Sequence, residues 1–206
     1  MSKKVLVVGN SPSVLQYNYG ELIDTFDIVI RCNWYKILGY ENHVGTKTSI
    51  WAIAIGREFM RIHEKQTSTH FLERDQDPKK MDGLWLRFSK SDRAGAMNYF
   101  NKIYGDVKHV EIPNDWYKDC IGLCCCKLAL QTWKNSEVWS FGNTFHLEQK
   151  NKLGRFHYYD YHLKKSELDI HLPTDSHCMK NNKVDLEKLP IKTLEENAHE
   201  IQRKKR

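Results

Sequence analysis

The stretch Val5-Leu6-Val7-Val8-Gly9-Asn10-Ser11-Pro12-Ser13 decides how the chain folds. Its first four residues are aliphatic without alternation, which is typical of a strand buried on both faces of a parallel sheet. Gly9, Asn10 and Ser11 are suited to an abrupt turn at the carboxyl end of that strand. Open α/β sheets bind ligands at this edge, where the glycine lets the backbone approach and the polar side chains add hydrogen-bonding groups.

Further strands and helices are expected to alternate along the chain. Strands are predicted at 27–31, 49–54, 69–72, 84–88, 107–112 and 138–141, and helices at 14–23, 56–63, 92–104, 122–133, 178–189 and 194–203. This order indicates a single-domain α/β fold with a doubly wound, mostly parallel sheet. We assign residues 1–190 to that domain and 191–206 to a basic helical tail. Because the second strand ends at Cys32, Asn33 should lie at the same edge as Asn10.

The net charge of +6 does not by itself indicate a nucleic-acid partner. Much of the excess lies in residues 203–206, and a terminal basic run is usually solvated, although it could attract an anionic partner. The remaining basic residues form no stripe interleaved with aromatic residues. No segment approaches the ~20 apolar residues of a membrane span, and the first residues lack the pattern of a signal peptide. We therefore expect a cytoplasmic protein.

The six cysteines indicate neither a disulfide framework nor a zinc site. Cys124, Cys125 and Cys126 are adjacent in an apolar run, which favours buried, unreactive thiols. No CxxC pair lies near a second pair. Neither a metal nor a cofactor is expected, and the first turn lacks the G-x-G-x-x-G pattern of an NAD-dependent oxidoreductase.

Over its first fifty residues the chain resembles the large sialyl motif of family 29 sialyltransferases. The matching positions are Val7-Val8-Gly9-Asn10-Ser11, Tyr19-Gly20, Ile23-Asp24, Phe26-Asp27, Arg31-Cys32-Asn33, Gly39-Tyr40 and Val44-Gly45-Thr46-Lys47-Thr48. Three shorter stretches follow in the order of the family. Residues 122–130, 137–138 and 141–142 resemble the small motif, with extra residues between 130 and 137. Residues 157–160 resemble the third motif, and His177 with Lys183, Leu186 and Leu189 the very small motif.

The resemblance implies a Rossmann-like variant of the GT-A fold and an inverting, metal-independent glycosyltransferase. Such an enzyme moves sialic acid, or a related acidic sugar, from a cytidine monophosphate (CMP) donor to a hydroxyl of an acceptor glycan. By the same resemblance, Asn10, with Ser11, and Asn33 bind the donor. Arg31 and Lys47, in the same motif, could bind phosphate or neutralise nearby acidic residues.

The later motifs imply the rest of the site. Cys120, Ile121 and Gly122 would bind the carboxylate and cytidine side of the donor. His157 and Tyr158 would face its phosphate, where hydrogen-bond donors meet the growing negative charge. His177 would be the catalytic base, because a histidine titrates near neutrality. His171 is the alternative base.

Several positions depart from the family pattern. The cysteines of its usual disulfide are replaced by Lys4 or Val5 and by Trp133, and Cys120-Ile121 replaces a Ser/Thr pair. Asn182 stands where the very small motif has Glu. These departures leave two alternatives open, a transferase for a different nucleotide sugar and a non-catalytic module that binds nucleotide sugars.

Overall fold

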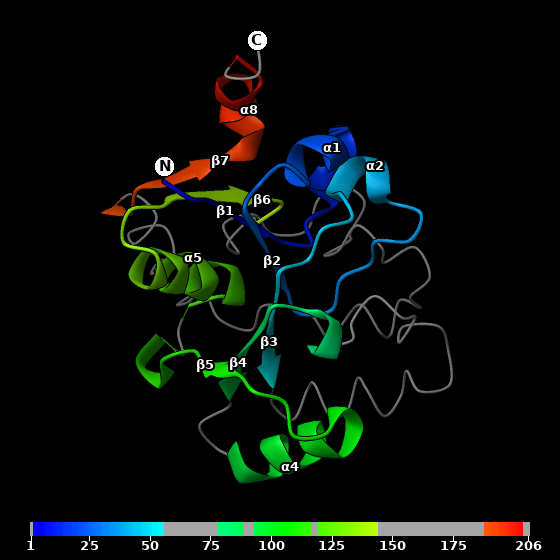
Figure 1. Ribbon diagram of the computed structural model, residues 1–206, viewed down its shortest axis with the longest axis vertical. Coiled ribbons are helices and arrows are strands. Elements are labelled where there is room, and N and C mark those ends of the chain that lie inside the picture. Colours follow the sequence, from blue (N-terminus) through cyan, green and yellow to red (C-terminus); the bar gives the residue numbers. More distant parts are fainter. Residues whose placement is uncertain (1, 56–77, 89–92, 117–118, 144–187, 204–206) are drawn as a thin grey trace.

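The computed structural model describes residues 2–55, 78–88, 93–116, 119–143 and 188–203 (Figure 1). These residues build one sheet of seven strands in the order β5-β4-β3-β2-β1-β6-β7, and every neighbouring pair is parallel. The strands are β1 (Lys4–Val8), β2 (Ile28–Cys32), β3 (Ile50–Ile55), β4 (Gly83–Phe88), β5 (Val110–Glu111), β6 (Glu137–Phe141) and β7 (Ile191–Thr193). The α-helices are α1 (Gly20–Ile23), α2 (Glu41–Val44), α4 (Arg93–Tyr104), α5 (Ile121–Thr132) and α8 (Leu194–Arg203), with 3-10 turns η1 (Pro12–Gln16), η2 (Pro78–Lys80) and η3 (Asn114–Trp116).

The prediction of a parallel, doubly wound α/β sheet is confirmed. β1 lies inside the sheet, paired with β2 on one side and β6 on the other, so the strand order reverses at β1. In open parallel sheets, the carboxyl ends of the strands at such a reversal form the crevice that binds ligands. The turn after β1 begins at this point.

Helices cover both faces of the sheet, because alternate residues of each strand point to opposite sides. Val5 and Val7 pack in the cluster that contains the α5 cysteines. Leu6 and Val8 pack on the opposite face with residues of η1, α1, α2 and α8. On that same side of β3 and β4, α4 contributes Phe100 to a third cluster.

The helix predicted at 14–23 is wrong in its extent. The structure has two short elements there, η1 and α1. Pro12 starts η1, and the Ser11 hydroxyl caps it by accepting a hydrogen bond from the Ser13 N–H at 3.3 Å. The chain then becomes extended at Tyr17 (φ −128°, ψ 143°), which ends the first turn before a longer helix can form.

Two smaller differences between the sequence prediction and the structure arise because tertiary contacts override the local sequence pattern. Loop 39–48 contains the short helix α2, and the strand expected at 107–112 is reduced to β5. The predicted elements at 56–63 and 69–72 lie outside the described residues, as does nearly all of the helix predicted at 178–189.

Residues 191–203 form a strand of the same sheet, β7, and a helix that packs on that sheet, α8. β7, which the sequence did not predict, pairs with β6, and α8 places Leu194 and Ala198 in the core beside Leu6 and Trp139. The boundary drawn from the sequence between residues 190 and 191 therefore falls immediately before an integral strand. None of the helices within the described ranges combines the length and apolar character needed to cross a membrane.

This placement predicts a clear effect on stability. Leu194→Ala should lower the free energy of unfolding by about 2–4 kcal/mol, because it leaves a cavity where a fully buried side chain packs. Urea denaturation measures the change, with Lys188→Ala, an exposed residue before β7, as the control. Equal midpoints for Leu194→Ala and the wild type would show that α8 is not part of the cooperative core.

Candidate functional site

Asn10 links the turn after β1 to the loop after β2. Its amide nitrogen donates to the carbonyl oxygens of Cys32 at 2.9 Å and Trp34 at 2.7 Å. Both amide hydrogens are used in this way, and two carbonyl acceptors fix which side of the amide carries the nitrogen. The Asn10 Oδ1 atom is therefore the group that can accept a hydrogen bond from a ligand.

Asn33 is held in an unusual backbone conformation. Its φ of 53° makes it the one non-glycine residue with positive φ in the described ranges. The Asn33 N–H donates to the Ala52 carbonyl, and its carbonyl accepts from the Trp51 indole, both at 2.7 Å. Its Oδ1 accepts from the Ala54 N–H at 3.1 Å, which leaves the side-chain NH₂ as the group for a ligand. Backbone held in a sparsely populated region is common at functional sites.

The structure thus brings the two predicted asparagines to the carboxyl ends of neighbouring strands. Asn10 offers an acceptor and Asn33 offers a donor, because the other half of each amide binds the protein itself. Such a pair suits a ligand that both donates and accepts hydrogen bonds, such as the edge of a nucleobase or a sugar hydroxyl.

Ser11 has a structural task within this turn. Its side chain is buried, its hydroxyl accepts from the Ser13 N–H and is 3.0 Å from the Ser13 hydroxyl, and its N–H donates to the Gly142 carbonyl at 2.9 Å. These bonds shape the turn that presents Asn10. Direct contact of Ser11 with a donor stays a prediction.

Arg31 stabilises the second half of the large motif. Its fully buried guanidinium donates to the carbonyl oxygens of Val44 at 2.7 Å and Gly45 at 3.1 Å, and to the Thr48 hydroxyl at 3.0 Å. These partners are backbone carbonyls and a hydroxyl, so the contacts give Arg31 a structural role that differs from both roles the sequence left open, phosphate binding and neutralisation of acidic residues. Arg31 fixes the loop that precedes β3.

Asp24 holds the same loop from the other side. Its carboxylate accepts from the Thr46 N–H at 2.8 Å and the Lys47 N–H at 2.8 Å, and from the Thr46 hydroxyl at 2.8 Å. Lys47 extends its ammonium to the Phe26 carbonyl. The charged residues of the large motif therefore hold the loop that precedes β3.

Cys120, Ile121 and Gly122 lie at the start of α5, where the small motif was expected to begin. Cys120 is the N-cap residue, and its Sγ accepts from the Leu123 N–H at 3.5 Å. Cys120 and Ile121 are each 8% exposed, and Gly122 is buried. A Cβ added to Gly9 or to Gly122 would meet the same atom, Asn143 Oδ1, so the first turn and the first turn of α5 are one side chain apart.

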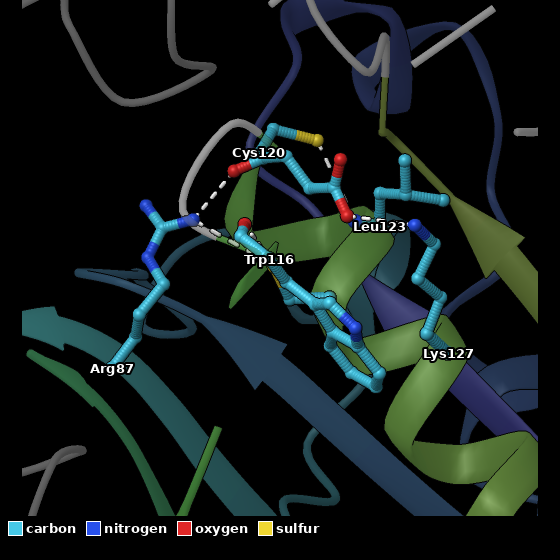
Figure 2. Close-up of polar contacts among 7 residues, drawn as sticks. Arg87, Trp116, Cys120, Leu123 and Lys127 are labelled. Atoms are coloured by element: carbon cyan, nitrogen blue, oxygen red, sulfur yellow. Dashed lines mark hydrogen bonds and ion pairs between the residues drawn. The ribbon is translucent and has the colours of Figure 1, made fainter. Parts of the chain in front are cut away.

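Arg87 positions the segment before α5 (Figure 2). It reaches from β4 and donates to the Asp119 carbonyl at 2.5 Å, with the Cys124 Sγ at 3.6 Å. Asp119 is buried and forms an ion pair with Lys127 at 2.8 Å, and the Lys127 ammonium lies 5.7 Å from the Trp116 ring. The sequence analysis did not single out Arg87, although a charged residue inside an apolar strand run was a signal for it.

The α5 cysteines are core residues, as predicted. Cys124, Cys125 and Cys126 are fully buried and free. Burial raises the pKa of Cys124 to about 11, against the smaller opposing effect of the Arg87 guanidinium. Burial also raises the pKa of Cys125 and Cys126 well above the usual value. These thiols stay neutral and are poor nucleophiles.

A carboxyl group that the sequence analysis missed supports the turn after β6. Glu195, in the first turn of α8, accepts from the Gly142 N–H at 2.8 Å. Burial raises the pKa of Glu195, and the hydrogen bond from Gly142 opposes that rise. The same carboxylate contributes to a raised pKa of Tyr19, after the larger effect of burial.

The remaining predicted site residues lie outside the described residues. These are His157, Tyr158, His177 and its alternative His171. Their roles stay predictions. Across the ranges that the structure describes, no three His, Cys, Asp or Glu side chains gather in a way that could hold a metal ion.

The comparisons with known proteins identify the family. Residues 2–115, more than half of the chain, match the model of glycosyltransferase family 29 (sialyltransferase), and the chain belongs to that family. A crystal structure of a mammalian sialyltransferase has the same fold, with a TM-score of 0.52, 17% identity, and coverage of 93% of this chain and 68% of that chain.

Three relatives show the range of named activities among similar proteins. The mouse CMP-N-acetylneuraminate-beta-galactosamide-alpha-2,3-sialyltransferase 4 is 27% identical over 194 residues, covering 77% of this chain and 54% of the relative. A chicken alpha-N-acetylgalactosaminide alpha-2,6-sialyltransferase 1 is 32% identical over 109 residues, 47% of this chain and 19% of its own. A beta-1,6-galactosyltransferase of Arabidopsis thaliana is 52% identical over 44 residues, 21% of this chain and 11% of its own. The chain thus spans about half the length of the mouse relative.

The backbone of Asn33 predicts a difference between two substitutions. Asn33→Gly and Asn33→Ala both remove the acceptor for the Ala54 N–H, but only alanine places a Cβ at positive φ. Asn33→Ala should therefore be less stable than Asn33→Gly by about 1 kcal/mol. Thermal and urea unfolding of the two variants measure this difference. Equal stabilities would show that the left-handed backbone is not retained.

The raised pKa of Glu195 predicts how stability depends on pH. Above pH 4.5, the unfolded chain releases the Glu195 proton while the folded chain still holds it. The free energy of unfolding therefore falls as the pH rises, until the pH passes the folded pKa of Glu195. Glu195→Gln keeps an acceptor for the Gly142 N–H and cannot ionise. Its Tm should exceed that of the wild type at pH 7 and equal it below pH 4.5.

Glu21→Gln, at an exposed position in the first turn of α1, is the control for the loss of one negative charge. It should show no comparable change with pH. A Tm difference between Glu195→Gln and the wild type that stays constant from pH 4 to pH 8 would contradict the assignment of a raised pKa.

Proposed function

We propose that the protein is a glycosyltransferase that moves sialic acid, or a related acidic sugar, from a CMP donor to a hydroxyl of an acceptor glycan. The observation that supports this most is the pair Asn10 and Asn33 at the sheet edge of a family 29 fold. The names of the mouse and chicken relatives support the sialic acid donor.

The donor binds between the first turn and the start of α5. A cytosine or ribose edge accepts from the Asn33 NH₂ group and donates to Asn10 Oδ1. The donor's anionic groups lie toward the first N–H groups of α5, because a helix N-terminus carries a partial positive charge. Arg87 keeps this end of α5 in place through Asp119.

In the proposed reaction, the acceptor hydroxyl attacks the anomeric carbon on the face opposite to the nucleotide. His177 takes the hydroxyl proton as general base. The bond between the anomeric carbon and the phosphate oxygen breaks, CMP leaves, and the configuration inverts. His157 and Tyr158 donate hydrogen bonds to the departing phosphate, a task that a metal ion performs in many other transferases.

A second candidate is transfer of an uncharged sugar from another nucleotide. The Arabidopsis relative, named as a galactosyltransferase, is the observation that favours it. In addition, the thiol of Cys120 and the apolar side chain of Ile121 supply no hydroxyl for a sugar carboxylate. Hydrolysis assays with a panel of nucleotide sugars separate the two, since turnover of uridine or guanosine sugars alone would exclude the sialyl donor.

The direct test is calorimetric titration with CMP, compared with uridine and guanosine monophosphates. We expect CMP to bind best, and Asn10→Ala and Asn33→Ala to weaken it at least tenfold, since each removes a hydrogen-bonding group at the edge. Asn98→Ala, on the exposed side of α4, is the matched control. Equal affinity for the three nucleotides, or unchanged affinity in both variants, would contradict the proposed donor site.

His177→Ala separates catalysis from binding. This variant should retain CMP affinity and lose transfer, because it removes only the proposed base. Full transfer by the variant would remove His177 from the mechanism. CMP binding without transfer in the wild type, across a panel of acceptors, would favour a binding module.

A further inference from the structure

The two segments on either side of the proposed donor site meet at one residue that neither motif assigns. Gly9 and Asn10 form the first segment, and Gly122 lies in the first turn of α5. Asn143, two residues after the end of β6, lies between them. Its contacts on both sides determine how far apart they can be.

The amide nitrogen of Asn143 is anchored to the ends of two central strands. It donates to the Val7 carbonyl at 2.9 Å and to the Ser140 hydroxyl at 3.0 Å, and lies 3.3 Å from the Phe141 carbonyl. All three partners are oxygen atoms, so the nitrogen must face them and the amide oxygen must face away. The side chain is therefore fixed in one orientation.

The amide oxygen of Asn143 faces two glycines. A Cβ built on Gly9 or on Gly122 would overlap Oδ1. Only glycine, which has no Cβ, allows the backbone to lie this close to the oxygen. Outside α5 itself, the three atoms nearest to such a Cβ at Gly122 all belong to the Asn143 side chain. At Gly9, the Gly142 carbonyl oxygen would clash as well. Asn143 thus acts as a spacer between the first turn and α5.

We propose that Asn143 is a positioning residue for the donor, whose anchored amide sets the separation between the Asn10 turn and the N-terminus of α5. This inference rests on the proposed function, because it places the donor between these two segments. A misplacement of about 1 Å in a binding constellation can cost as much as 100-fold in rate.

A double-mutant cycle tests the contact without any ligand. Gly122→Ala alone should lower the Tm by several degrees, because its methyl group overlaps Asn143. In the Asn143→Ala background, the same substitution should lower the Tm much less. Gly9→Ala is the matched control, because its clash with the Gly142 backbone persists when Asn143 is shortened.

The functional readout separates positioning from stability. Asn143→Ala, studied well below its Tm, should raise the Kd for CMP and the donor KM by about 10- to 100-fold. The acceptor KM should change less than twofold, because the proposal places only the donor between these two segments. A general loss of folded protein would instead lower the apparent kcat and leave both KM values unchanged. Asn98→Ala should behave as the wild type.

The outcomes distinguish the possible failures. An equal cost of Gly122→Ala in the two backgrounds would overturn the spacer contact. CMP affinity within twofold of the wild type in folded Asn143→Ala would overturn the positioning role and leave the proposed function intact. If the wild type does not bind CMP, the proposed function fails and this inference fails with it.

Discussion

Two hydrogen bonds from the Asn10 amide to the Cys32 and Trp34 carbonyls hold the candidate site together. They join the loops that leave β1 and β2, which are neighbours in the sheet but more than twenty residues apart in the chain. Once these loops are joined, the Asn33 side chain can act beside Asn10 Oδ1. Each asparagine uses one half of its amide for the protein, and the other half remains for the ligand.

Most of the large motif serves this arrangement indirectly. Arg31 binds backbone carbonyls of the loop before β3, and Asp24 binds backbone N–H groups of the same loop. The buried charge of Arg31 is tolerated because hydrogen bonds compensate its loss of hydration. Many residue types of the large motif are therefore determined by hydrogen bonds within the motif. Only a few of its residues lie at the carboxyl edge of the sheet, where the donor is proposed to bind.

The sequence predicted the central strands, because unalternated aliphatic runs such as Val5–Val8 have few other interpretations. It also placed Asn10 and Asn33 at one edge, since both follow parallel strands. It could not predict β7, which is three residues long and includes the exposed Lys192, or the role of Glu195. Asn143 was missed because its partner Val7 is 136 residues away, and such a contact leaves no local pattern.

The most direct test of the central claim is an NMR titration of ¹⁵N-labelled protein with CMP, observing the asparagine side-chain NH₂ resonances. The Asn33 pair, assigned from its absence in Asn33→Ala, should shift on binding because its NH₂ group faces the ligand. The Asn10 NH₂ pair should shift less, since both of its hydrogens bind backbone carbonyls, and the exposed Asn98 pair should not move. Saturable CMP binding that leaves the Asn33 resonances unchanged would contradict the account, because the nucleotide would then bind away from this edge.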